Sequence, residues 1–150
     1  MLVDYHMHTR LCRHAVGEPG EYLRAAMAAG LDEIGLADHS PWPAGYDAQF
    51  RMTPEQFPEY RELVRELQAA AGKVQVRFGL EVDWVPGRMD EVRERLTAEP
   101  FDFVLGSVHY TDALPFDDPA HAWRWQGAEQ VEQVWQRYAA LMLDLVNAGI

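Results

Sequence analysis

The chain has 150 residues, of which 48% are hydrophobic and 25% charged, and it carries a formal net charge of −11. This length permits one domain with a real hydrophobic core, and the composition is that of an ordinary globular protein. Lys73 is the single lysine and the arginines are scattered, so a nucleic-acid partner is not expected, because phosphate backbones are bound by clustered basic side chains.

Cysteine usage and the N-terminal residues favour a cytoplasmic protein. Cys12 is the only cysteine, which excludes an internal disulfide and fits a reducing compartment. No apolar run is long enough to cross a bilayer, and the acidic Asp4 stands where a signal peptide would carry basic residues. We therefore expect a cytoplasmic location and no membrane partner.

Strand and helix patterns alternate along the chain. Strands are expected at 3–6, 31–39, 74–84 and 101–110, and helices at 18–30, from residue 53 onward, at 86–96 and at 131–146. The second helix has the clearest start: Thr53 as N-cap, Pro54 in the first turn and Gln56 completing a capping box. Regions 40–52 and 111–126 are predicted loops. Strict β/α alternation predicts an α/β fold with a mostly parallel sheet covered by helices.

The last helix has the most regular apolar period. Its stripe comprises Val131, Val134, Trp135, Tyr138, Leu141, Met142, Leu145 and Val146. Asn147 and Gly149 are typical of a helix C-terminus, and Ile150 is predicted to begin a fifth strand. The chain is thus expected to be the N-terminal part of a longer fold, with about four βα units.

Metal-competent side chains follow each of the four strands. His6 and His8 alternate at the end of the first strand and so point to the same face. The remaining candidates are His14 in the next loop, His39 at the end of the second strand, Glu81 in the third and His109 at the end of the fourth. Each alone has an ordinary structural interpretation, but the carboxyl ends of parallel strands share one face of the sheet. Together they predict a metal centre.

The ligand types indicate which ions and which chemistry to expect. A histidine-rich set with one carboxylate suits Zn, Mn or Fe, and more ligands than one ion needs imply several ions, with Glu81 as the natural bridge. Closely spaced divalent ions are suited to phosphate-ester hydrolysis. Asp38, next to His39, is expected to accept a hydrogen bond from a metal-binding imidazole and so to orient it. His121 is expected to be a structural or surface residue, and Cys12 a small half-buried residue and not a ligand.

The same motifs resemble a known family. The stretches "DYHMHTRLCRHAVGEPGEYLRAAMAAGLDEIGLADHSPWP", "FGLEVDWVPG" and "DFVLGSVHYTDALPFDDP" resemble the PHP (polymerase and histidinol phosphatase) superfamily, in particular its histidinol-phosphate phosphatase branch. The resemblance covers nearly the whole chain. It implies one PHP-type phosphoesterase domain over 1–150, a distorted (β/α) barrel with three metal ions, and hydrolysis of L-histidinol phosphate in histidine biosynthesis.

The resemblance also implies a ligand assignment. His6, His8 and Glu81 would hold the first ion, Glu81 and His109 the second, and His14 with His39 the third. The family's remaining ligands, a G-H pair and a late D-x-H, do not follow His109 here. Each ion would then lack a ligand, and completing the barrel would need a C-terminal half or self-association.

Two alternatives remain open at this point. The first is a PHP phosphoesterase for another small phosphorylated metabolite or for a nucleic-acid end, although the acidic charge disfavours the latter. The second is a non-catalytic fragment or metal-binding module that acts through a partner. A truncated barrel would leave an open sheet edge and apolar surface, which motivates that alternative.

Overall fold

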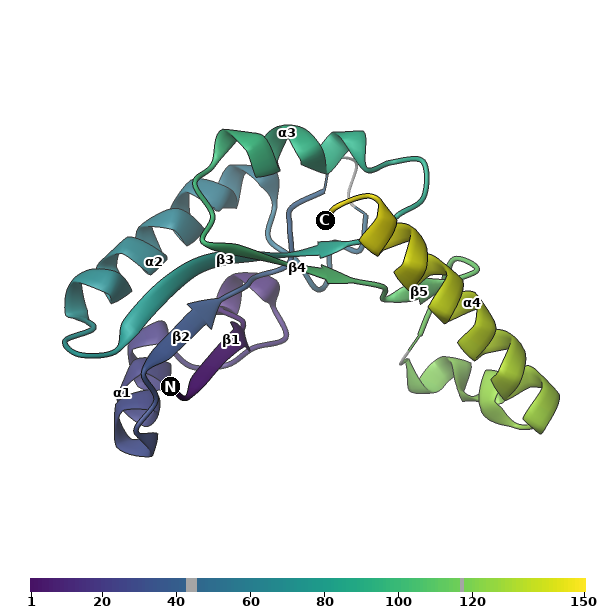
Figure 1. Cartoon of the computed structure of the whole chain (residues 1–150), viewed down its shortest axis with the longest axis horizontal. Coiled ribbons are helices and arrows are strands. Elements are labelled where there is room, and N and C mark those ends of the chain that lie inside the picture. The colour runs from purple at the N-terminus through teal and green to yellow at the C-terminus, as the bar shows by residue number, and fades with distance from the viewer. Residues whose placement is uncertain (43–45, 117) are drawn as a thin grey trace. The chain divides into compact units, whose positions relative to one another are not determined.

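The computed structural model describes residues 1–42, 46–116 and 118–150 (Figure 1). Parts of the two predicted loops, residues 43–45 and 117, lie outside the described residues. The chain forms two compact units. Unit 1 comprises 1–82 and 90–105, and unit 2 comprises 83–89 and 106–150.

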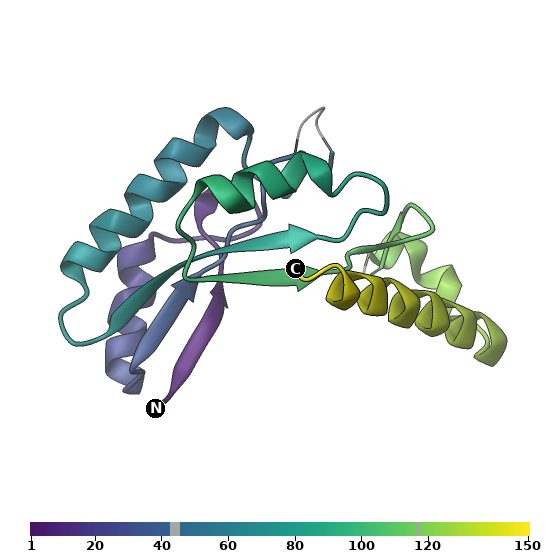
Figure 2. The ribbon, with the colours of Figure 1, turned by 45° about the horizontal axis from the view of Figure 1, so that its top comes forward.

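A four-stranded sheet with the order β1-β2-β3-β4 organises unit 1. Its strands are β1 (Val3–Met7), β2 (Glu33–Leu36), β3 (Gln75–Asp83) and β4 (Phe103–Ser107), the last residues of β3 and β4 being counted with unit 2. The pairs β1–β2 and β2–β3 are parallel, and both views show β1 beside β2 (Figures 1 and 2). Helices α1 (Pro19–Ala29), α2 (Phe57–Ala70) and α3 (Asp90–Ala98) alternate with them. The predicted α/β alternation is confirmed.

The helix ends follow the local signals in the sequence. Helix α1 ends at Gly30, which adopts a left-handed φ of 75° and is the residue type that does so at little cost. The predicted capping box of Thr53 and Gln56 is present, with the Thr53 N–H donating to Gln56 Oε1 over 3.0 Å. The first turn, Pro54–Gln56, is a 3₁₀ turn, and the α-helix begins only at Phe57.

One buried tyrosine ties helix α2 to the sheet. Tyr60 is fully buried, and its hydroxyl lies 2.8 Å from the carbonyl oxygens of both Leu36 in β2 and Gly79 in β3. The same oxygen accepts the N–H of Asp38 over 3.4 Å. These contacts fix the carboxyl end of β2 against β3, which is the end that carries the candidate ligands.

The sheet leaves room for an aromatic ring over two glycines. A Cβ added at Gly35 or Gly79 would lie 2.5 or 2.2 Å from Phe103 Cζ, far inside van der Waals contact. The Phe103 ring stacks on Tyr5 with centroids 5.0 Å apart. Both glycines are therefore required by close packing, and a larger side chain at either position would displace the ring.

Next to this ring, a charged network joins three neighbouring strands. Arg77 in β3 donates two hydrogen bonds to Glu33 in β2, Nε to Oε2 over 2.8 Å and Nη2 to Oε1 over 3.0 Å. Tyr5 in β1 donates to the same carboxylate over 2.5 Å. The Arg77 guanidinium, and secondly the Tyr5 hydroxyl, lower the pKa of Glu33 from 4.5 to about 2.

This network predicts a pH-dependent contribution to stability. A carboxylate whose pKa is lowered by folding stabilises the folded state above its ordinary pKa of 4.5, and that stabilisation is lost as the pH falls towards 2. The coupling free energy between Glu33 and Arg77 should therefore be present at neutral pH and vanish across that window. A double-mutant cycle with Glu33→Gln and Arg77→Met, followed by denaturant unfolding at several pH values, measures it. A pH-independent coupling would contradict the assignment.

Unit 2 contains more structure than the sequence pattern predicts. The predicted loop at 111–126 includes the strand β6 (Leu114–Pro115), which pairs antiparallel with β5 (Tyr110–Thr111), and the 3₁₀ helix η4 (Pro119–Trp125). The hairpin turn has positive φ at both Asp112 and Ala113. This part of the loop prediction was wrong, because an alanine at such a position gives no sequence signal for the turn.

The last helix, α4 (Ala128–Asn147), confirms the prediction at 131–146. Only part of its predicted stripe is buried: Val134, Leu141 and Leu145 are, whereas Trp135 is 50% and Val146 64% exposed. Ile150, the last residue of the sequence, is assigned to no strand, and a fifth strand that begins there stays a prediction. Among the described residues, no helix is both long enough and apolar enough to cross a membrane.

Candidate metal centre

The first candidate ligands lie at the carboxyl end of β1. His6 and His8 have ring centroids 5.0 Å apart, as expected for residues i and i+2 on one face of an extended chain. The side chain of His6 is 55% exposed, and that of His8 is 14% exposed. The pair therefore reaches from the surface into the interior of unit 1.

A buried carboxylate anchors the turn that follows this pair. Asp38 is fully buried and accepts two hydrogen bonds of 2.5 Å from Thr9, one from its backbone N–H and one from its hydroxyl. The Thr9 hydroxyl oxygen in turn accepts the Leu11 N–H over 3.2 Å and so caps the short 3₁₀ helix η1 (Arg10–Cys12). Burial raises the pKa of Asp38 to about 6, against the lowering effect of the Thr9 bonds.

The described hydrogen bonds of the Asp38 side chain thus hold the turn that follows β1. Its predicted role in orienting an imidazole stays a prediction. Sequence reasoning did not single out Thr9, although Thr9 directly follows His8 in the stretch "HMHT".

The same turn presents His14. Arg13 has a left-handed φ of 62°, a conformation uncommon outside glycine, and it reverses the chain after η1. The His14 ring then lies 4.8 Å from that of His8 and 5.2 Å from that of His39, centroid to centroid. A local backbone reversal, which the sequence pattern did not indicate, therefore brings this exposed loop histidine to the cluster.

Cys12 connects this turn to the second strand. Its side chain is fully buried, and its Sγ accepts the backbone N–H of His39 over 3.0 Å. Burial, and then the Asp38 carboxylate, raise the pKa of the thiol well above its ordinary value. Because Sγ also lies within 4.8 Å of ring nitrogens of His8 and His14, the expectation that Cys12 is not a ligand stays a prediction.

Glu81 lies at the centre of the histidines. It is 1% exposed, and one of its oxygens, Oε2, lies 3.1 Å from His6 Nε2, 3.3 Å from His8 Nε2 and 3.1 Å from His39 Nδ1. Backbone hydrogen bonds hold Glu81 beside the end of β2. Its N–H donates to the backbone carbonyl oxygen of Asp38, and its own carbonyl oxygen accepts the N–H of Ser40. This burial shows that Glu81 is not a solvated carboxylate at the end of a strand.

The arrangement fits a divalent cation. A carboxylate oxygen offers two lone-pair directions, whereas three imidazole nitrogens converge on the single Oε2 atom of Glu81. Neutral imidazole nitrogens and a buried carboxylate are the donor set that Zn, Mn or Fe prefers. His6, His8 and Glu81 place one donor atom each within 4.8 Å of one another. Five predicted ligands, including His14 and His39, are thus brought together within unit 1.

The sixth predicted ligand, His109, belongs to unit 2. Its ring nitrogen Nδ1 hydrogen-bonds to the carboxylate of Asp83, which is 1% exposed. The convergence of His109 with the other five residues stays a prediction. Asp83 was missed at the level of sequence, although it stands two residues after Glu81 in the stretch "LEVDW". His121 in η4 lies 3.5 Å from Asp118, the N-cap of that helix, and its structural or surface role stays a prediction.

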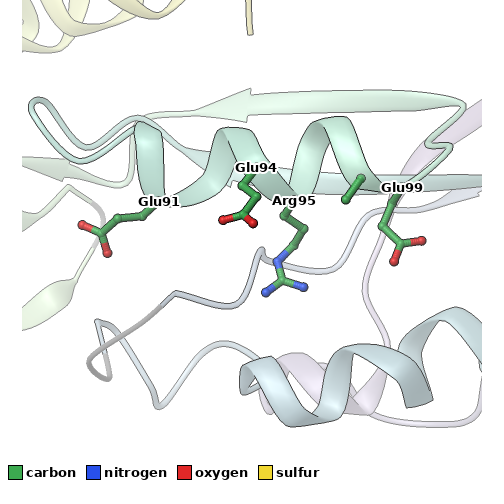
Figure 3. A pocket seen from close by; sticks show the side chains of 5 residues that line it. Glu91, Glu94, Arg95 and Glu99 are labelled. Atoms are coloured by element: carbon green, nitrogen blue, oxygen red, sulfur yellow. The ribbon is translucent and has the colours of Figure 1, made fainter.

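A separate hollow on helix α3 has a different character. It measures about 310 Å³, and none of the predicted ligands lines it. Figure 3 shows Glu91, Glu94 and Arg95 projecting from the same side of the helix. The Arg95 guanidinium lies 4.7 Å from the centroid of the Phe57 ring, and Glu99 pairs with Arg61 over 3.1 Å. Local contacts thus account for two of its charges, those of Arg95 and Glu99.

Comparison with known protein families shows which family this chain belongs to. The PHP domain family matches residues 4–149, and the chain belongs to that family. The fold agrees: a crystal structure from Listeria monocytogenes, described as that of a candidate histidinol phosphatase, superposes with a TM-score of 0.73 at 20% identity. The superposition covers 89% of this chain and 58% of that one, so the expectation of an incomplete PHP-type barrel is confirmed.

Similar proteins carry one functional name. A Deinococcus radiodurans protein named as a probable histidinol-phosphatase is 40% identical over 153 residues, covering 99% of this chain and 57% of that protein. A Lactococcus lactis histidinol-phosphatase is 27% identical and covers 97% and 52%. A crystal structure of the Lactococcus lactis histidinol phosphate phosphatase with Zn, L-histidinol and phosphate matches at 27% identity and a TM-score of 0.60, covering 79% of this chain and 44% of that one. The chain therefore spans about half the length of these relatives.

Proposed function

We propose that this protein is a divalent-metal-dependent phosphatase that hydrolyses L-histidinol phosphate to L-histidinol and phosphate. The observation that carries the proposal is the convergence of His6, His8 and His39 on one oxygen of the buried Glu81. A related enzyme holds Zn, L-histidinol and phosphate, and another relative with the same functional name is 40% identical to this chain. The substrate assignment rests on these relatives, and the proposal that the site binds metal rests on the cluster.

The residues of this chain would divide the work as follows. We assign His6, His8 and Glu81 to one ion, Glu81 with His109 to a second, and His14 with His39 to a third, with Zn, Mn or Fe as the metals. Divalent ions, when bound, supply an activated water and neutralise the charge on the phosphate oxygens. The buried Glu81 supplies the negative charge that holds cations in a site otherwise built from neutral imidazoles.

The remaining residues hold these side chains in place. Thr9 and Asp38 fix the turn that carries His14, and the Cys12 thiol receives the N–H of His39. Such preorganisation matters because phosphoryl transfer is accelerated by positioning and by electrostatic stabilisation of the transition state. The protein is proposed to act in the cytoplasm, in histidine biosynthesis, on a small phosphorylated metabolite.

Turnover of histidinol phosphate by the complete protein, with added Mn or Zn, tests this proposal. We expect phosphate release that depends on the metal and is abolished by a chelator. The same assay with other phosphomonoesters and with single-stranded DNA serves as the specificity control. Cleavage of another phosphate ester with none of histidinol phosphate would remove the substrate assignment, and metal-independent or absent hydrolysis would remove the proposed chemistry.

A further inference from the structure

Unit 2 contains a buried carboxylate that the proposed function does not yet use. Asp83 ends strand β3 and is 1% exposed, so it has been taken out of water almost completely. Its Oδ1 atom hydrogen-bonds to Nδ1 of His109, whose side chain is 33% exposed. A carboxylate is costly to bury unless it is paired, so this contact is a defined partnership.

The chemistry of the two groups determines where the proton lies. When Asp83 is ionised, its carboxylate only accepts hydrogen bonds, and the His109 nitrogen that faces it then carries the hydrogen. In the neutral imidazole the lone pair is then on Nε2, the opposite nitrogen of the ring. The bond also restrains rotation of the ring, because Asp83 is itself held within a strand.

We propose that Asp83 is a positioning residue that fixes His109 as the Nδ1–H tautomer and directs Nε2 to the metal. The metal half of this inference rests on the proposed function; the tautomer half does not. Carboxylates that receive the second N–H of a metal-binding histidine raise its basicity and set its orientation. His109 would therefore bind metal through Nε2 because Asp83 occupies Nδ1.

The chain offers a matched control in the same unit. Asp118 and His121 form a second Asp–His contact, at 3.5 Å, between partners whose side chains are 42% and 26% exposed. This pair is three residues apart within one turn and contains no predicted ligand. Loss of Asp118 should leave both the His109 tautomer and metal binding unchanged.

The first experiment requires no metal. Long-range ¹H–¹⁵N correlation spectra of the metal-free full chain, labelled with ¹⁵N-histidine and assigned with His109→Ala, report which ring nitrogen carries the proton. We expect His109 to be the Nδ1–H tautomer in the wild type and to change towards the Nε2–H form in Asp83→Ala, but not in Asp118→Asn. An Nε2–H tautomer in the wild type would overturn the proposal even if Asp83→Ala fails to fold.

The second experiment measures divalent-metal affinity by calorimetry. Asp83→Ala is expected to weaken Zn or Mn binding by roughly 10–100-fold, the usual effect of removing an outer-shell carboxylate. In the His109→Ala background the same change should have no further effect, because the two act through one ring. If Asp83→Ala weakened metal binding equally in the wild type and in the His109→Ala background, the positioning role would be overturned. Failure to bind metal in the wild type, with the tautomer as expected, would instead count against the proposed function.

Discussion

Replacing Glu81 by glutamine is expected to weaken divalent-metal binding by more than the roughly 10–100-fold that loss of an outer-shell partner costs. Glutamine keeps the size of the side chain but removes the negative charge that three imidazole nitrogens surround at 3.1–3.3 Å. Without it, the remaining ligands of unit 1 are neutral, and the complete protein should lose turnover as well. Calorimetric titration with Zn or Mn gives the affinity, and phosphate release gives the activity.

Glu33→Gln is the matched control for that substitution. Glu33 is also a buried glutamate on a strand of the same sheet, but its partners are Arg77 and Tyr5, not histidines. Glu33→Gln should change the free energy of unfolding and leave the metal affinity unaltered. An affinity in Glu81→Gln equal to that of the wild type would show that Glu81 does not bind the metal.

The second large effect is expected from Thr9→Val. The substitution is nearly isosteric, yet it removes the hydroxyl that donates to the buried Asp38 over 2.5 Å and caps the turn at Leu11. Leaving a buried carboxylate without such a partner costs about 1–3 kcal/mol of unfolding free energy. Because the turn also carries His14, metal affinity should fall together with stability. Denaturant unfolding and calorimetry on the same samples measure both.

Thr53→Val provides the comparison. Like Thr9, Thr53 is the N-cap of a 3₁₀ turn, Pro54–Gln56. None of its described contacts involves a predicted ligand. Loss of that cap should cost about 1 kcal/mol and leave metal binding unchanged. If Thr9→Val behaved like Thr53→Val in both measurements, the coupling of Thr9 to the histidine cluster would be refuted.

The elements of the fold were predictable where a local signal exists. The capping box at Thr53, the glycine after α1 and the period of α4 are short-range features, and each gave an element within a few residues of its observed bounds. The β5–β6 hairpin was not predictable, since its turn places Asp112 and Ala113 at positive φ, where Asn-Gly or Asp-Gly would be expected. The turn residues contact later parts of unit 2: Arg137 Nε lies 3.3 Å from Asp112 Oδ1, and Arg124 donates to the Thr111 hydroxyl over 2.6 Å. A single sequence does not reveal such contacts.

The site shows the same division. Convergence of His6, His8, His39 and Glu81 followed from the rule that parallel strands end on one face, and it needed no knowledge of side-chain packing. The approach of His14 depends in addition on the backbone reversal at Arg13. The contacts that hold the ligands and the turn after β1 in place depend on packing and were not predictable. Neither the contact of Asp38 with Thr9 nor that of Asp83 with His109 is local in sequence: the partners are 29 and 26 residues apart.

The most direct test of the central claim, that the histidines around Glu81 bind a divalent cation, is anomalous diffraction from crystals grown with Zn or Mn. We predict an anomalous peak within bonding distance of Glu81 Oε2 and of the ring nitrogens of His6 and His8. The account would be contradicted by a crystal in which the bound metal is at full occupancy but its anomalous peaks lie elsewhere. In that crystal these imidazoles would be hydrogen-bonded only to Glu81 and water.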